Sequence, residues 1–80
     1  MKSVVIRYFA QLREVAGRDS EEFRGDFSSY KVLYEELAKL HGFTLPASMV
    51  KVAVNDEFCS MEDAIQSGAS VVFIPPVAGG

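Results

Sequence analysis

The last six residues carry the clearest chemical pattern in the chain. Two adjacent prolines fix the backbone near the polyproline conformation, so we expect this segment to project from the fold. The two glycines that follow have no Cβ and can enter a channel too narrow for any other residue. The terminal carboxyl group of Gly80 is therefore the predicted reactive group, with Gly79 as part of the same catalytic end, and the four residues before them are predicted partner contacts. In order, the segment reads Pro75, Pro76, Val77, Ala78, Gly79 and Gly80.

A buried strand is predicted immediately before this tail. Residues 71–74 are all apolar and lead directly into Pro75. A frayed terminus is the ordinary alternative, since end residues are often poorly ordered. Because the strand would hold the chain as far as the prolines, we expect a flexible tail only from about residue 75 to residue 80.

The first strand, predicted from Lys2 to Phe9, decides which face of the sheet is open. Its side chains alternate between the two faces. Arg7 is costly to bury, so its face is predicted to be the outer one. Phe9 would then be exposed there and is our first candidate for a partner contact, with Ile74 as the second. One face carries Val4, Ile6 and Tyr8, and the other carries Val5, Arg7 and Phe9.

Two helices are predicted. The first is short, runs from Ala10 to Ala16 and ends at Gly17. The main helix begins after Ser29, a favourable N-cap residue, and ends before Gly42. Apolar residues at helical spacing give the main helix one buried stripe, which consists of Tyr30, Leu33, Tyr34, Leu37 and Leu40.

The remaining segments complete a sheet. Strands at both ends of the chain, with one substantial helix between them, predict an α+β domain in which the helix covers one face of a mixed sheet of four or five strands. The other face is left open as a docking surface. The further elements expected are a polar edge strand over Ser20–Arg24 with Phe23 turned inward, a strand over 50–54, a turn at Asn55-Asp56, a strand over 57–59, one helical turn over 61–65, and a turn at Ser67-Gly68 before the last strand, 69–74.

Length and composition predict one small globular domain over residues 1–80. Apolar residues make up 49% and charged residues 24%, close to the globular average, which argues against disorder. With 8 basic and 11 acidic residues the net charge is −3, so we expect no nucleic-acid partner and favour a basic partner surface. No run is long enough to span a bilayer, no signal pattern precedes the fold, and one cysteine allows no internal disulfide. A cytoplasmic protein without a membrane partner is therefore expected.

Side chains suited to catalysis are few. His41, the only histidine, falls at the end of the main helix, where a favourable interaction with the helix dipole explains it. Cys59 has no cationic neighbour in sequence and is interpreted as a small core residue. No bound metal or stable cofactor is expected, so a partner would supply the catalytic groups. Four acidic residues lack the spacing of a metal site and are interpreted as a solvated edge: Asp19, Glu21, Glu22 and Asp26.

Three segments resemble the small, sulfur-carrying subunit of molybdopterin synthase. They are residues 8–14 (YFAQLRE), 52–55 (VAVN) and 73–80 (FIPPVAGG), in the order and spacing of that family. The resemblance covers nearly the whole chain and is most specific in the last segment. It implies a β-grasp, ubiquitin-like fold, which is more definite than periodicity alone allows.

The resemblance also implies a reaction cycle. An ATP-dependent adenylyltransferase related to ubiquitin-activating enzymes would adenylate the carboxylate of Gly80. A sulfur-donating protein would then replace AMP and leave a thiocarboxylate. The tail would enter the large catalytic subunit of the synthase, where the sulfur passes to cyclic pyranopterin monophosphate in molybdenum cofactor biosynthesis. ATP is used by the activating partner, and the carrier is not catalytic alone.

Two other functions remain open. The sulfur carrier of thiamine thiazole synthesis is also a β-grasp protein that ends in Gly-Gly, but it is typically shorter and lacks a segment like YFAQLRE after the first strand. The second function is of a different class: a ubiquitin-like modifier would join the same carboxyl end to lysines of other proteins, or the chain would be a plain β-grasp interaction domain. The product formed by the activated chain distinguishes the three reactions, and a plain interaction domain would form none.

Overall fold

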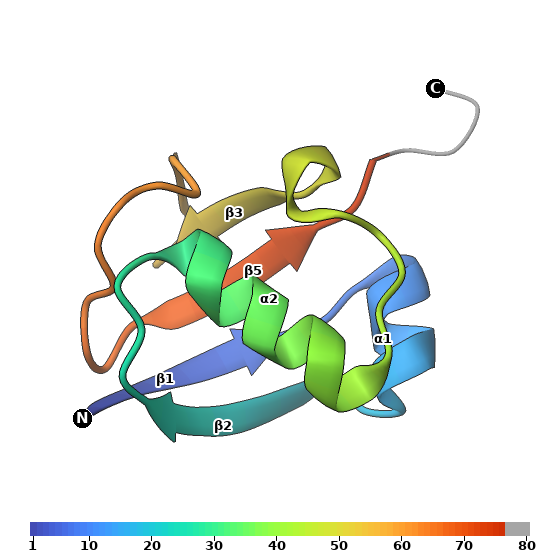
Figure 1. Cartoon of the computed structure of the whole chain (residues 1–80), viewed down its shortest axis with the longest axis horizontal. Helices are drawn as coiled ribbons and strands as arrows, with labels where there is room; N and C mark the ends of the chain where they lie inside the picture. The colour runs from blue at the N-terminus through green and yellow to red at the C-terminus, as the bar shows by residue number, and fades with distance from the viewer. Residues whose placement is uncertain (77–80) are drawn as a thin grey trace.

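The computed structural model describes residues 1–76 of the chain. The predictions made for Val77, Ala78, Gly79 and Gly80 lie outside the described residues. In chain order, the elements are β1 (Lys2–Arg7), α1 (Ala10–Ala16), β2 (Ser20–Gly25), α2 (Tyr30–His41), the short 3-10 helix η1 (Ala47–Met49), β3 (Lys51–Val54), β4 (Glu57–Cys59) and β5 (Ser70–Ile74) (Figure 1).

The five strands form one mixed sheet, and α2 lies across one of its faces (Figure 1). The strand order is β2-β1-β5-β3-β4, in which β1 and β5 are parallel and every other pair is antiparallel. The side chains buried between sheet and helix form one core. The predicted two-layer α+β fold, with its mixed sheet and single main helix, is confirmed.

The alternation predicted for β1 is also confirmed. Val4 and Ile6 are fully buried, while Val5 and Phe9 are exposed hydrophobic residues on the opposite side. The strand ends at Arg7, two residues earlier than predicted, because Ala10 has a positive φ of 50° and turns the chain into α1. Pairing with β2 continues past the strand end, since the Tyr8 amide donates to the Asp19 carbonyl at 2.8 Å.

The limits of α2 are as predicted. Ser29 caps the helix by accepting a hydrogen bond from the Val32 amide, and Gly42 ends it in the left-handed conformation. The prediction of the buried stripe is wrong for its last residue, because Leu40 is 60% exposed. His41, one turn after the buried Leu37, takes the inward position instead.

The helical turn predicted over residues 61–65 is absent from the described structure, although Ile65 is buried as an apolar anchor. The segment is a turn in which the Ser60 amide donates to the Asp63 carboxylate at 3.1 Å. Its backbone carbonyls accept hydrogen bonds from the start of α2: the Lys31 amide donates to the Met61 carbonyl, and the Tyr30 amide donates to the Asp63 carbonyl. The first amides of a helix have no partner within it, and the loop satisfies two of them without forming a helical turn of its own.

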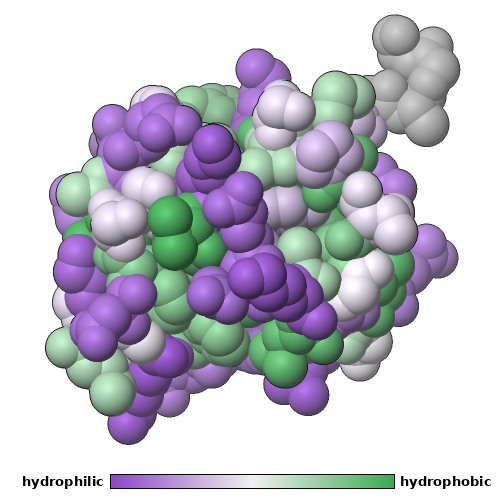
Figure 2. Space-filling view, viewed as in Figure 1, coloured by the Kyte–Doolittle hydropathy of each residue, from purple (hydrophilic) through white to green (hydrophobic). Residues whose placement is uncertain are grey.

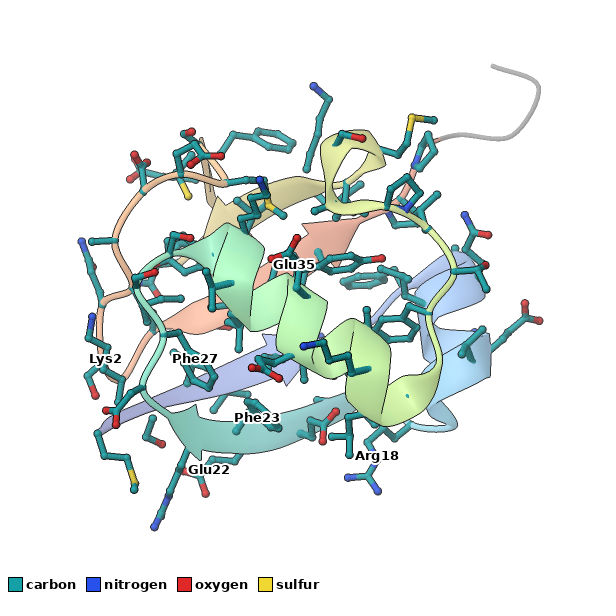
Figure 3. The ribbon with its side chains drawn as sticks, in the orientation of Figure 1. Lys2, Arg18, Glu22, Phe23, Phe27 and Glu35 are labelled. Atoms are coloured by element: carbon teal, nitrogen blue, oxygen red, sulfur yellow. The ribbon has the colours of Figure 1, made fainter. Side chains whose placement is uncertain are left out.

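The edge strand β2 contains a carboxylate that is not solvated. Phe23 faces inward, as predicted, and stacks with Phe27 in the core beside α2 (Figure 3). Glu21 lies on the same inner side with only 9% of its side chain exposed, so its interpretation as part of a solvated edge is wrong. Its neighbours along the chain, Asp19 and Glu22, are exposed as expected.

Glu21 joins the end of β1 to the end of α2. Its Oε2 accepts a hydrogen bond from the Tyr8 hydroxyl and lies 2.5 Å from His41 Nε2. Arg18 approaches the other carboxylate oxygen at 3.6 Å. Burial raises the pKa of Glu21, but the hydrogen bonds from Tyr8 and His41, with the positive charges of His41 and Arg18, outweigh it, so the pKa is lowered. The ionised carboxylate is therefore the form that fits the fold.

We expect Glu21→Gln to lower the free energy of unfolding by about 1.5 to 3 kcal/mol at neutral pH, because it removes a buried charged hydrogen-bond acceptor. Since the folded pKa is lowered, this stabilisation is present above the ordinary carboxyl value of 4.5 and is lost as the pH falls through the lower folded value. Urea unfolding of both proteins across the acid range measures the difference. The control is Glu35→Gln, on the exposed side of α2 (Figure 3), and an equal effect of the two changes would contradict the role of Glu21.

Candidate functional site

The chain enters its C-terminal segment from the middle of the sheet. Strand β5 is paired on both sides, with β1 and with β3, and its Val71 and Phe73 are fully buried. Pro75 is also buried, whereas Pro76 is exposed. The fixed part of the chain thus includes Pro75, one residue into the predicted tail, and it ends at the opposite side of the molecule from the N-terminus (Figure 1).

The face of the sheet opposite α2, which we call the open face, has one row of side chains across four strands. Residues directly opposite in neighbouring strands share a face. Arg7 of β1 is opposite Val72 of β5, which is opposite Ala53 of β3, which is opposite Phe58 of β4. On the other side of the molecule, hydrophilic side chains surround the hydrophobic ones over α2 (Figure 2).

Phe9 and Ile74 lie at the end of this open face from which the chain leaves the sheet. They follow Arg7 and Val72 by two residues each along parallel strands, so both side chains lie on the outer side. Phe9 is 46% exposed, and the Arg7 guanidinium lies 5.9 Å from its ring centroid. The outward position predicted for Phe9 is confirmed, the register adds Ile74 to the same face, and the binding of a partner by either residue stays a prediction.

Phe58 is a candidate contact that the sequence reasoning missed. At 72% exposure it is the most exposed aromatic residue among the large hydrophobic ones of the described chain. Beside it is an open hollow of ≈ 350 Å³ lined by Val50, Lys51, Phe58, Cys59 and Met61. The sequence contained enough to predict its position, because the two-residue turn at Asn55-Asp56 sets the register that pairs Phe58 with Ala53.

The residues considered for side-chain chemistry are not arranged for it. Cys59 packs against the core, where burial and then the charge of Asp63 raise the pKa of its thiol. A raised pKa keeps the thiol protonated and weakly nucleophilic at neutral pH. Over residues 1–76, no three His, Cys, Asp or Glu side chains are grouped as metal ligands. Within that same range, no helix has the length and apolar character needed to cross a membrane.

The match to known proteins covers nearly the whole chain. The model of the ThiS family matches residues 6–80. A molybdopterin synthase sulfur carrier subunit from Haemophilus influenzae is 32% identical over an alignment of 78 positions, which covers 94% of this chain and 96% of that protein.

Two solved structures share the fold over almost their full length. A molybdopterin converting factor subunit 1 from Pyrococcus furiosus has a TM-score of 0.78 at 29% identity, covering 96% of this chain and 100% of its own. The small archaeal modifier protein 1 of Haloferax volcanii has a TM-score of 0.78 at 25% identity, covering 98% of this chain and 99% of its own. The fold is thus the ubiquitin-like β-grasp, and the chain belongs to the ThiS family, with molybdopterin synthase sulfur carrier subunits among its relatives.

Proposed function

We propose that this chain is the sulfur carrier subunit of molybdopterin synthase. The observation that carries the proposal is the similarity to such a subunit over 94% of the chain. The structure adds support, because a strand buried in the centre of the sheet leads to the sequence that ends in Gly79-Gly80, beside a sheet face that exposes Phe9 and Phe58.

The proposed chemistry takes place on the carboxyl group of Gly80. A carboxylate is a poor electrophile, so an activating partner first transfers AMP to it from ATP and releases pyrophosphate. A sulfur donor then displaces AMP, and the product is a thiocarboxylate. This group is ionised at neutral pH and attacks without a general base. A carrier with no activated thiol suits this role, and the raised pKa of Cys59 is consistent with it.

Three proteins take part in the proposed cycle: the adenylyltransferase, the sulfur donor, and the large subunit that holds cyclic pyranopterin monophosphate. Because ATP and the precursor must both be available, we place the cycle in the cytoplasm. The five residues from Pro76 to Gly80 can span at most roughly 18 Å when extended. Each partner that acts on Gly80 must therefore hold its reacting groups within that distance of the buried Pro75.

We infer that the open face docks on these partners, with Phe9, Ile74 and Phe58 as apolar contacts. Pro75 is buried within this domain, so residues 76–78 would occupy the entry to the partner's channel, and Gly79 would let Gly80 reach the reacting groups. Phe9 and Phe58 lie toward different parts of the open face, so a partner that contacts both is oriented as well as bound.

Use as a protein modifier is the second candidate, since the archaeal modifier has the same fold and 25% identity. In that case a lysine amine displaces AMP from the activated carboxyl group and forms an isopeptide bond. The sulfur carrier of thiamine thiazole synthesis uses the same activation with a different acceptor. The product formed by the activated chain separates these reactions from molybdopterin formation.

Blocking the tail should abolish function. With ATP, the activating enzyme and a sulfur source, the intact chain should gain the mass of one sulfur-for-oxygen exchange, and with the large subunit it should then yield molybdopterin. Deleting Gly80 withdraws the reacting carbon by about 3.3 to 3.6 Å, and misplacement on that scale costs on the order of a hundredfold or more in rate. A residue added after Gly80 should be as damaging, whereas the same residue added before Met1 serves as the control. Molybdopterin formed by a C-terminally extended chain that mass spectrometry shows to be unprocessed would refute the proposal.

Truncating the exposed aromatic residue at the base of the tail should weaken docking. Phe9→Ala is expected to lose roughly thirtyfold in affinity for the large subunit, because a buried aromatic anchor contributes about 2 kcal/mol or more. Phe58→Ala should also weaken binding. Calorimetry on folded variants measures the loss, with Leu40→Ala as the control because Leu40 is exposed on α2. If Phe9→Ala and Leu40→Ala bind equally well, the docking face lies elsewhere.

Cys59 should be dispensable for sulfur transfer. The sulfur is carried on Gly80, so Cys59→Ser should become thiocarboxylated and deliver sulfur at the normal rate. A modest loss of stability is expected, because the change places a hydroxyl beside the core. Single-turnover transfer from the isolated thiocarboxylate is the measurement. A folded, thiocarboxylated variant that delivers no sulfur would show that the thiol takes part.

A further inference from the structure

The charge of the open face is opposite in sign to that of the whole chain. The chain has a net charge of −3. The register of the sheet puts Arg24 opposite Ser3 and Glu22 opposite Val5, so both belong to the open face together with Arg7 and Lys51. Three cations and one anion give this face a charge of +2. Glu22 lies 3.6 Å from Arg24, and this contact leaves Arg7 and Lys51 as the excess.

These two cations stand on either side of the strand that carries the tail. Arg7 is opposite Val72 on one side of β5, and Lys51 is opposite Ile74 on the other. Both are exposed, and neither takes part in an ion pair among residues 1–76. The Arg7 guanidinium is also held near the ring of Phe9.

A partner that covers Val72 and Ile74 must also cover Arg7 and Lys51, because neighbouring strands are only about 4.8 Å apart. Removing a cation from water without an opposite charge is costly, whereas a carboxylate placed against it recovers much of that cost. Arginine suits this pairing, since its planar guanidinium can hold a carboxylate through two hydrogen bonds.

We propose that the large subunit which docks on the open face presents carboxylate side chains to Arg7 and Lys51, one on each side of the base of the tail. This inference rests on the proposed function and adds the chemistry of the partner surface. The net charge of the chain favoured a basic partner surface. In this proposal the basic groups of the partner are those that bind the anionic end of the tail, and acidic side chains surround the entrance to that site. Such a pattern fixes the orientation of docking and excludes partners that lack the acids.

Matched charge reversals test the proposal. Arg7→Glu and Lys51→Glu change the net charge by the same amount as Lys31→Glu and Lys39→Glu, which lie on the exposed side of α2. Calorimetric titration of the purified large subunit from the same organism, at low and high salt, gives the affinities. We expect each open-face reversal to raise the Kd by about tenfold at low salt, with little effect from the α2 reversals. At high salt the difference in Kd between the open-face reversals and the α2 reversals should be smaller, because salt screens the charges.

The neutral variants Arg7→Gln and Lys51→Gln keep the test valid if a reversal fails to fold, and they should show a smaller loss in the same direction. Thiocarboxylated open-face variants should transfer sulfur with a raised KM and an unchanged kcat, because the chemistry at Gly80 is untouched. Equal affinities for open-face and α2 reversals, with normal binding by the unmodified chain, would overturn the carboxylate pairing and leave the sulfur-carrier proposal standing. If the unmodified chain does not bind the large subunit, both proposals fail.

Discussion

The parallel pairing of β1 with β5 is the constraint on which the rest of the structure depends. It brings residues 5–7 beside residues 70–72 and puts the last strand in the middle of the sheet. Because β5 is hydrogen-bonded on both sides and its inward side chains are fully buried, the chain is fixed up to the point where it leaves the sheet. The same pairing sets Arg7 and Phe9 beside that point. The point at which the chain leaves the sheet and the side chains that surround it on the open face therefore have one physical origin.

The buried carboxylate of Glu21 supports this arrangement from the other side of the sheet. It binds Tyr8, which directly precedes Phe9, and His41, which ends α2. The aromatic rings of Tyr8, His41 and Phe43 pack against one another around it, with centroids 5.5 to 5.9 Å apart. A polar group within an apolar cluster must be placed in one geometry to be satisfied, so it specifies how the end of β1 meets the helix. The outward direction of Phe9 depends on the inward direction of Tyr8.

Sequence patterns predicted the features that depend on neighbouring residues. Alternation in β1 identified the outward side of Phe9, and the capping residues Ser29 and Gly42 set the limits of α2. The pattern failed where a partner distant in sequence decides the outcome. His41 replaces Leu40 in the buried stripe because Glu21, twenty residues away, provides a charge for it. Carbonyls of the loop over residues 60–63 accept hydrogen bonds from the first amides of α2. A pattern read from the loop residues alone could not include this helix, which lies about thirty residues earlier in the chain. The excess of cations on the open face could be recognised only from the strand register, since Arg7 and Lys51 are far apart in sequence.

The central place of β5 also affects how the protein is made. A ribosome releases the chain from its N-terminus, and a domain generally folds as a unit. Here β1, β2 and the helices emerge first, but β1 and β3 have no strand between them until Ser70–Ile74 follows. Stable pairing over so long a separation in sequence has to wait for that strand. The five-stranded sheet and the buried base of the C-terminal segment therefore form together, when Ser70–Ile74 pairs with β1 and β3, and a translation product that stops before Ser70 lacks the strand that joins the two halves of the sheet.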